Sequence, residues 1–339
     1  MKLNLFWLFY YVLIYLFGLS HSSLFMASHD FTGNIELLEY GSSWLKSPWY
    51  SIYKYCFSSI IKPDEFLIAL WALIPLLLTR VSGNVLALVT SRQPSRFIIY
   101  LLIYLAVSWN TCFRFFVLNI PVPTAHFLFQ SLASALLLQS FFFYSSRLSR
   151  LFLFLAVSFH YTTLFPVAIC MLCSNLFFPN LFASHRSIKY FTFTFRLALI
   201  VTSLFSSFLI LPLIQFFKGI TMSDSLGVSQ SDARVVILLF FFSVSSFLLV
   251  SLGLVTYAYN SKKLQLLSSY LTLSSTAAIL SGLSMSFLLA GSVDLAYRLA
   301  YPVFVWSSPL FFISLVLIVR LFAKPNLNRL GSAPPSGVT

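Results

Sequence analysis

The residues best suited to chemistry lie together just before the last apolar run of the sequence. Asp294, Tyr297, Arg298 and Tyr301 place an acid, a cation and two aromatic rings side by side. A planar guanidinium matches phosphate oxygens in a bidentate way, and a carboxylate accepts a proton from an attacking hydroxyl. We therefore expect phosphate or pyrophosphate binding here, with Arg298 as the first candidate ligand and Asp294 as a candidate base.

Further candidates occur where other apolar runs meet polar segments. Arg114 and Arg234 are the lesser candidates for pyrophosphate binding, and anchoring to lipid headgroups is the alternative for each arginine. His160, in the middle of a long apolar region, is a candidate for orienting a substrate or accepting a proton. Three acids of the first polar segment are further candidate bases: Asp30, Glu36 and Glu39.

The sequence contains none of the common motifs of soluble enzymes. A phosphate-binding glycine loop, a zinc helix of the HExxH type and a GxSxG nucleophile elbow are all missing. No metal site and no cofactor are expected. The four cysteines are expected to be packing residues, because they are isolated or lie in an apolar run.

The amino-acid composition indicates whether water or lipid surrounds most of the chain. Of 339 residues, 59% are hydrophobic, 18% are aromatic and only 9% are charged, whereas soluble proteins carry about a quarter charged residues. Apolar runs of roughly 20 residues, enough to cross a hydrocarbon core of about 30 Å, recur along the chain. They lack the alternation of a barrel wall, so the sequence predicts an all-α polytopic membrane protein.

The apolar runs predict about ten spans in one membrane domain, residues 1–322, followed by a disordered tail, residues 323–339. The first span is expected to remain uncleaved. A proline disfavours helix in the residue before it, so residues 151–184 are expected to cross twice, with a break between His160 and Pro166. The expected spans cover residues 3–19, 66–79, 97–113, 127–144, two short spans within 151–184, 190–217, 235–259, 264–290 and 299–319. The expected outer loops include 21–65 and 218–234, and a polar turn is expected over 80–96.

The positions of the basic residues predict which end of each span faces the cytoplasm. They are scattered between apolar runs rather than gathered in a patch, so the net charge of +13 does not indicate a nucleic-acid partner. With both termini cytoplasmic, most Lys and Arg fall inside, as is usual for short loops, and a nine-span alternative fits worse. Every carboxylate then falls outside: Asp30, Glu36, Glu39, Asp64, Glu65, Asp224, Asp232 and Asp294.

Five short segments carry a resemblance through their order along nearly the whole chain. They are Asp30 to Tyr55, Gln130-Ser131-Leu132-Ala133, Arg147 to Arg150, Phe159-His160-Tyr161-Thr162-Thr163 and Arg298-Leu299-Ala300-Tyr301. This layout resembles the EpsG/Wzy-like polysaccharide polymerases of bacterial inner membranes. The chain departs from the family at Phe129, where the family has an arginine before the glutamine, and Arg114 is the candidate replacement.

The resemblance implies an enzyme of the glycosyltransferase type. It implies that polyprenyl-pyrophosphate-linked oligosaccharide units are joined on the outer face of the inner membrane, with Gln130 among the pyrophosphate contacts and no nucleotide or other cofactor. The implied partners are the lipid-linked oligosaccharide, the bilayer, and other assembly proteins such as a flippase or a chain-length regulator.

Other classes of membrane protein remain as alternatives. A flippase for lipid-linked oligosaccharides, or another polysaccharide transporter, is the first alternative, although polar residues along several spans would then be expected. A membrane acyltransferase would show more charge within its helices. A non-catalytic subunit of an assembly machine is a further alternative.

Overall fold

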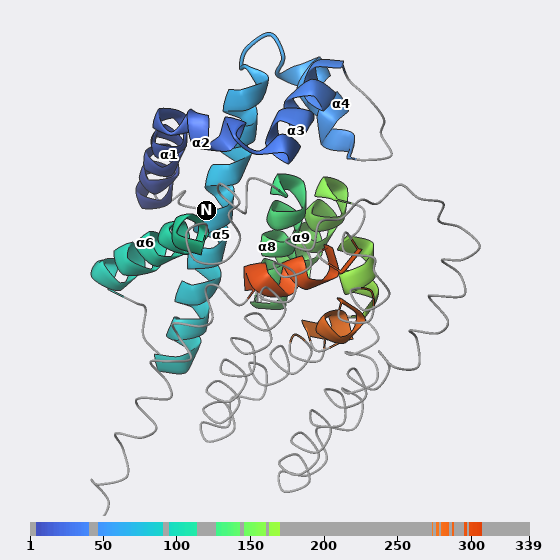
Figure 1. Cartoon of the computed structure of the whole chain (residues 1–339). Coiled ribbons are helices and arrows are strands. Elements are labelled where there is room, and N and C mark those ends of the chain that lie inside the picture. The colour runs from blue at the N-terminus through green and yellow to red at the C-terminus, as the bar shows by residue number, and fades with distance from the viewer. Residues whose placement is uncertain are drawn as a thin grey trace, which may run out of the picture.

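The computed structural model shows a helical protein (Figure 1). The residues that the structure describes are 5–40, 47–90, 95–113, 127–142, 146–160, 163–169, 273, 276–277, 279–284, 287, 295–296 and 298–306. Within these ranges all regular structure is helical, which confirms the all-α class. The main helices are α1 (Leu5–Ser20), α2 (Ser22–Met26), α3 (His29–Tyr40), α4 (Pro48–Cys56), α5 (Pro63–Thr90), α6 (Arg96–Phe113), α8 (Leu128–Phe142) and α9 (Ser146–Phe159).

One helix among the described residues is long and apolar enough to cross a membrane by itself. It is the stretch Pro63–Ala87 of α5. Shorter apolar stretches occur in α1, α6 and α8. The spans expected within 190–259 and the tail expected at 323–339 lie outside the described residues.

The second expected span is longer than the sequence suggested. Helix α5 has 28 residues and continues through Arg80 to Thr90, so the polar turn expected over residues 80–96 is wrong as far as residue 90. Ser82 fits inside the helix because its hydroxyl donates to the carbonyl of Leu78 (2.9 Å). Val81 and Val85 are fully buried, and this packing outweighs the polar character of the stretch.

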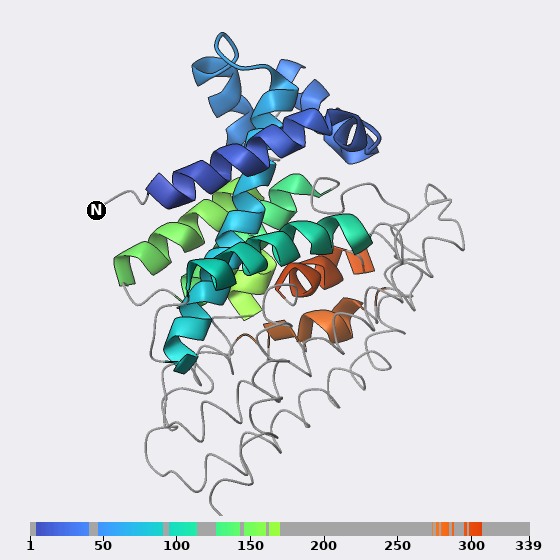
Figure 2. The ribbon, with the colours of Figure 1, turned by 90° about the vertical axis from the view of Figure 1, so that its left-hand side faces the viewer.

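Helix α1 lies across α5 rather than along it (Figure 2). The hydroxyl of Tyr11 donates to the carbonyl of Ala69 (3.2 Å). Gly18, about two turns further along α1, meets the same part of α5, where a Cβ atom would lie 2.6 Å from Cγ2 of Ile68. Glycine therefore allows the close approach at this steep crossing.

The segment expected to be the first outer loop, residues 21–65, is largely helical. Ser47 caps α4, because its hydroxyl accepts a hydrogen bond from the backbone N–H of Trp49 and Pro48 stands at the first helical position. Helix α4 packs against α3 and also contacts three later helices. Aromatic ring pairs make these contacts: Tyr53 with Phe66 of α5 (4.8 Å), Tyr50 with Phe129 of α8 (5.0 Å) and Trp49 with Phe159 of α9 (4.4 Å, nearly parallel).

These contacts fix the relative directions of the helices. Helix α4 meets the beginnings of α5 and α8 and the end of α9, so α5 and α8 run the same way and α9 returns. The helical residues 298–306 cross beside α8 (Figures 1 and 2). Three hydrogen bonds join them to it: Gln130 with Arg298, Ser131 with Tyr301, and Ser134 with Trp306.

Helix α8 has no polar face exposed to solvent. Every residue from Leu128 to Gln139 is buried, because the helix packs against both α5 and α9. A helix that is buried on all sides positions its few polar side chains rigidly. Its two buried glutamines, Gln130 and Gln139, hydrogen-bond to backbone carbonyls outside α8.

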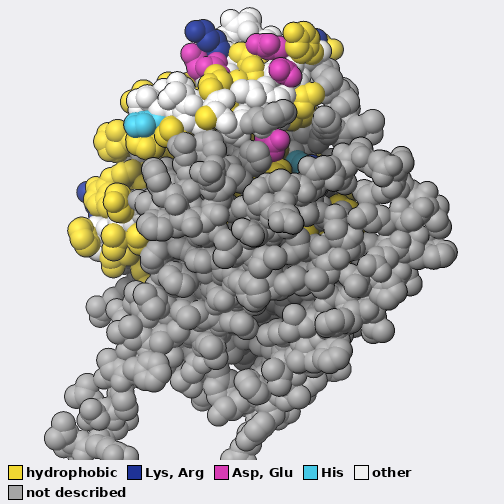
Figure 3. Space-filling view, in the orientation of Figure 1, with side chains coloured by type: hydrophobic (Ala, Val, Ile, Leu, Met, Phe, Trp, Pro, Cys, Tyr) yellow, Lys and Arg dark blue, Asp and Glu magenta, His cyan; other side chains and the backbone are white. Residues whose placement is uncertain are grey.

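The acids and the exposed apolar residues occupy different parts of the surface (Figure 3). The described carboxylates come from α3 and the first turn of α5, and they gather near α4. Asp224, Asp232 and Asp294 lie outside the described residues. Exposed apolar side chains cover α1 and α6, and they include Leu5 and Phe97, which are 82% and 73% exposed. Water would not solvate such a face well, whereas lipid would.

The break expected within residues 151–184, between the fifth and sixth spans, coincides with an interruption of the helix in the described residues. Helix α9 ends at Phe159, His160 is not helical, and helical structure covers residues 164–169. Pro166 falls in the first turn of this second stretch, where a missing N–H costs no helical hydrogen bond. The rest of the expected second crossing, residues 170–184, lies outside the described residues.

Candidate functional site

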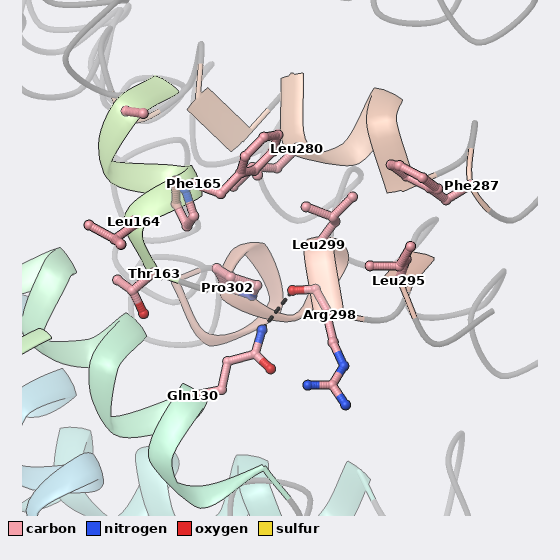
Figure 4. A pocket seen from close by; sticks show the side chains of 12 residues that line it. Gln130, Thr163, Leu164, Phe165, Leu280, Phe287, Leu295, Arg298, Leu299 and Pro302 are labelled. Atoms are coloured by element: carbon pink, nitrogen blue, oxygen red, sulfur yellow. Dashed lines mark hydrogen bonds between the residues drawn. The ribbon is translucent and has the colours of Figure 1, made fainter. Parts of the chain in front are cut away.

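The candidate site is a cavity of about 520 Å³ beside the beginning of α8 (Figure 4). Its other walls come from residues 163–168 and from described residues between 280 and 302. Most of the lining is apolar, with Leu280, Phe287 and Leu299 among the contributors. The polar side chains of the lining are Gln130, Thr163 and Arg298.

A proline explains how Gln130 is held. Within the helical residues 298–306, Pro302 stands four positions after Arg298 and has no N–H to donate to the Arg298 carbonyl. The side-chain Nε2 of Gln130 donates to this carbonyl instead, at 2.7 Å. Gln130 is only 3% exposed, so α8 supplies in the interior the donor that the other helix lacks.

This bond also fixes the polarity of the Gln130 amide. A carbonyl oxygen accepts hydrogen bonds only, so the amide nitrogen must face Arg298 and the amide oxygen must face away. Figure 4 shows this oxygen on the side where the Arg298 guanidinium lies. The buried Oε1 has no hydrogen-bond partner among the described residues. It is a buried, unpaired acceptor on a residue that lines the cavity.

Two neighbouring hydrogen bonds attach the helical residues 298–306 to α8. The hydroxyl of Ser131 donates to the carbonyl of Phe127 (2.7 Å), so the hydroxyl of fully buried Tyr301 donates to Ser131 (2.9 Å). The indole of Trp306 donates to the carbonyl of Ser134 (2.9 Å). Arg298 is therefore carried on a helix whose position along α8 is fixed.

His160 lies within electrostatic reach of Arg298. Burial, and then the positive charge of Arg298, lowers the pKa of His160 from 6.5 to about 4. The imidazole is therefore neutral near pH 7 and can accept one hydrogen bond while donating another. Trp49 helps to position the end of α9 by donating to the hydroxyl of Ser158 (3.1 Å) and stacking on Phe159.

Asp30 approaches the same end of the molecule. Burial, and then the negative charge of Asp30, raises the pKa of Tyr50, whose hydroxyl donates to the side chain of Asn34. The charge of Asp30 also acts on the hydroxyl of Tyr301. An acid from α3 therefore lies within electrostatic range of residues next to Gln130 and Arg298.

The other candidate residues are not all brought to this place. Glu36 and Glu39 are exposed, and in a helix of 3.6 residues per turn Glu39 lies about half a turn from Asp30. Asp294, Arg114 and Arg234 lie outside the described residues.

Two features of the site were absent from our list of candidates. Thr163 lines the cavity and belongs to the small-residue segment after His160. Pro302 was visible next to the Arg298 cluster, and its spacing of four from Arg298 was the signal for an unpaired carbonyl.

Cysteine and metal chemistry do not add to this site. Cys56, at the end of α4, is exposed and free, so the expectation that it is a packing residue is wrong, because α4 packs through its other face. In the part of the chain that the structure describes, His, Cys, Asp and Glu form no group of three or more that could hold a metal ion.

Arg298 and Gln130 bring a cation and an unpaired acceptor to the lining of an apolar cavity, and a neutral imidazole lies within electrostatic reach of the cation. This combination suits an anionic amphiphile, whose charged part binds the guanidinium while its apolar part is buried. The chain matches no protein-family model, no curated protein and no solved structure.

Proposed function

We propose that the protein is an inner-membrane polysaccharide polymerase that joins oligosaccharide units carried on polyprenyl pyrophosphate. The observation that carries the proposal is that Gln130 and Arg298, from distant segments of the chain, line one cavity. Two further segments supply titratable groups: His160 lies within electrostatic reach of Arg298, and the charge of Asp30 acts on Tyr301. These are the segments whose order resembles EpsG/Wzy-like polymerases.

The cavity suits the donor substrate. Its apolar lining can bury the isoprenoid units nearest the pyrophosphate. The guanidinium of Arg298 binds the pyrophosphate and stabilises the negative charge that it gains on leaving. The exposed apolar faces of α1 and α6 would contact the bilayer in which the rest of the lipid lies.

The reaction needs a nucleophile, a base and a leaving group. A hydroxyl of the acceptor unit attacks the anomeric carbon of the donor, a new C–O bond forms, and the bond from that carbon to the pyrophosphate oxygen breaks. The hydroxyl proton passes to a base, and polyprenyl pyrophosphate leaves. Asp30 is the proposed base, because a carboxylate also stabilises the positive charge that develops at the anomeric carbon. Neutral His160 orients the attacking hydroxyl.

We infer the ten-span topology with both termini cytoplasmic from the distribution of basic residues, because it places most Lys and Arg on the cytoplasmic side. In that arrangement the spans containing α5 and α8 both cross from outside to inside, and the described parts of both helices begin near α4. A nine-span chain would instead move Lys262, Lys263 and the C-terminal basic residues outside. Reporter fusions test this: a fusion at Lys189 should report a cytoplasmic site and one at Ser229 an external site. An external Lys189 would contradict the proposal.

An Arg298 variant tests the function. Arg298→Ala should abolish long surface polysaccharide chains and leave single units, because the leaving pyrophosphate loses its cation. Arg298→Lys should restore polymerisation in part, since it keeps the charge but not the bidentate fork. The measurement is the length distribution of surface polysaccharide, at equal protein levels in the membrane.

The control is Arg96→Ala, because Arg96 is exposed at the beginning of α6 and does not line the cavity. It should leave the length distribution unchanged. If Arg298→Ala also leaves it unchanged, the proposed role of Arg298 is wrong. If surface units disappear altogether while lipid-linked units collect on the inner face, the protein is a flippase instead.

A further inference from the structure

We propose that Gln130 determines specificity by accepting a hydrogen bond from a sugar hydroxyl of the ligand, and that it is not a pyrophosphate ligand. This inference rests on the proposed function, because it concerns the sugar attached to the same pyrophosphate. It revises the role that the sequence suggested for Gln130. The argument depends on which atoms of the amide are already engaged.

The donor side of the amide is engaged inside the protein. Nε2 donates at 2.7 Å to the carbonyl of Arg298, which Pro302 deprives of its helical donor. Rotating the amide by half a turn would place two oxygens against each other. The orientation seen in Figure 4 is therefore the one that the backbone imposes.

The acceptor side has no partner among the described residues. Oε1 of Gln130 is buried and without a hydrogen bond, and an unpaired buried acceptor is unfavourable. Phosphate oxygens are also acceptors, so they would be repelled by Oε1. A hydroxyl group, by contrast, donates a hydrogen bond to Oε1 and removes the unfavourable state.

The neighbouring groups make the hydroxyl of a sugar the best fit. Gln130 and Arg298 both line the cavity and are linked through the Arg298 backbone. A lipid-linked sugar presents a pyrophosphate and, attached to it, a ring with hydroxyls. When Arg298 binds the phosphate, the first sugar is the part of the ligand adjacent to Gln130.

The same helix offers a matched control. Gln139 is fully buried on α8, its Nε2 donates to the carbonyl of Leu77 at 2.7 Å, and its Oε1 has no partner among the described residues. Gln139 does not line the cavity. It therefore reproduces the chemistry of Gln130 without access to the ligand.

The experiment measures binding to the purified full-length protein in lipid nanodiscs. The probes are unsubstituted polyprenyl pyrophosphate and polyprenyl pyrophosphate carrying one glucose, galactose or N-acetylglucosamine. Wild-type protein should bind at least one sugar-linked probe about tenfold more tightly than the bare lipid, as one hydrogen bond allows. Gln130→Met should remove this preference, so that it binds the sugar-linked probe and the bare lipid equally tightly, while Gln139→Met should keep the preference.

The outcomes separate this inference from the proposed function. If Gln130→Met weakens the bare and the sugar-linked probes equally, or if wild-type protein shows no preference, the inference is wrong although the proposed function stands. If wild-type protein binds none of the probes, the proposed function itself fails. Should Gln130→Met fold poorly, the double variant Gln130→Met/Pro302→Ala is used, because the alanine that replaces Pro302 supplies a backbone N–H to the Arg298 carbonyl.

Discussion

The two ends of α8 place the same side chain in nearly the same local geometry. At each end a buried glutamine donates its amide nitrogen to a carbonyl of another helix at 2.7 Å and leaves its oxygen without a partner among the described residues. The carbonyls differ. The one that Gln130 reaches belongs to Arg298, four residues before a proline, and the one that Gln139 reaches belongs to Leu77, four residues before Val81.

This difference decides what each glutamine contributes. Val81 has a backbone N–H within the continuous helix α5, so the Leu77 carbonyl has a helical donor as well as Gln139. The Arg298 carbonyl depends on Gln130, because Pro302 has no N–H. Identical distances can therefore describe an additional bond at one end and an essential one at the other.

The largest expected effect separates the two glutamines by stability. Gln130→Met should lower the free energy of unfolding by about 1–3 kcal/mol, because it removes the hydrogen bond to a carbonyl that Pro302 cannot serve. Gln139→Met should change it by less than about 1 kcal/mol, since the Leu77 carbonyl keeps a donor and an unpaired oxygen is removed. Unfolding of the purified variants in detergent measures both. Equal losses would contradict the distinction.

A second substitution should sharpen the comparison. Pro302→Ala restores an N–H at the position that the Arg298 carbonyl requires, so it should recover about 1 kcal/mol of the stability lost in Gln130→Met. The same Pro302→Ala substitution in a Gln139→Met background should not recover any of the stability lost in Gln139→Met. A double-mutant cycle on the wild-type protein, Gln130→Met, Pro302→Ala and the double variant of these two gives the coupling free energy between positions 130 and 302. Additive effects in the Gln130 pair would remove the role assigned to Pro302.

The smallest expected effect is a pH dependence of stability. It arises from His160, which lies within electrostatic reach of Arg298, the hydrogen-bond partner of Gln130. Burial and Arg298 hold the folded-state pKa of His160 at about 4, below its ordinary value of 6.5. The unfolded chain therefore binds more protons between these values, and stability falls as the pH falls. Between about pH 7 and pH 6 the loss from this group should be less than about 1 kcal/mol.

The variant His160→Gln tests this pH dependence. It should flatten the dependence of unfolding on pH over the same interval, because glutamine does not titrate. Gln139→Met should leave the pH dependence as it is in the wild-type protein. An unaltered pH profile in His160→Gln would show that the imidazole is not held neutral by its surroundings.

The sequence was sufficient for the helical class and for the end of a helix before His160, whereas the roles of Gln130, His160 and Arg298 stay predictions. Apolar periodicity and proline chemistry are local, so they can be read without a structure. It was insufficient for the end of α5, because tertiary packing of Val81 and Val85 extends the helix through a polar stretch. The polarity of the Gln130 amide was also hidden, since it depends on a carbonyl 168 residues away.

The contacts of α4 with the end of α9 affect the order in which parts of the chain can fold. Its indole and its capping serine bind Ser158, at sequence separations of 109 and 111 residues. A chain that emerges from the ribosome with its N-terminus first must therefore synthesise α9 before the aromatic face of α4 can be covered. Until then this face is uncovered, and in the membrane location that we propose, the bilayer interface would accept its tyrosine and tryptophan rings.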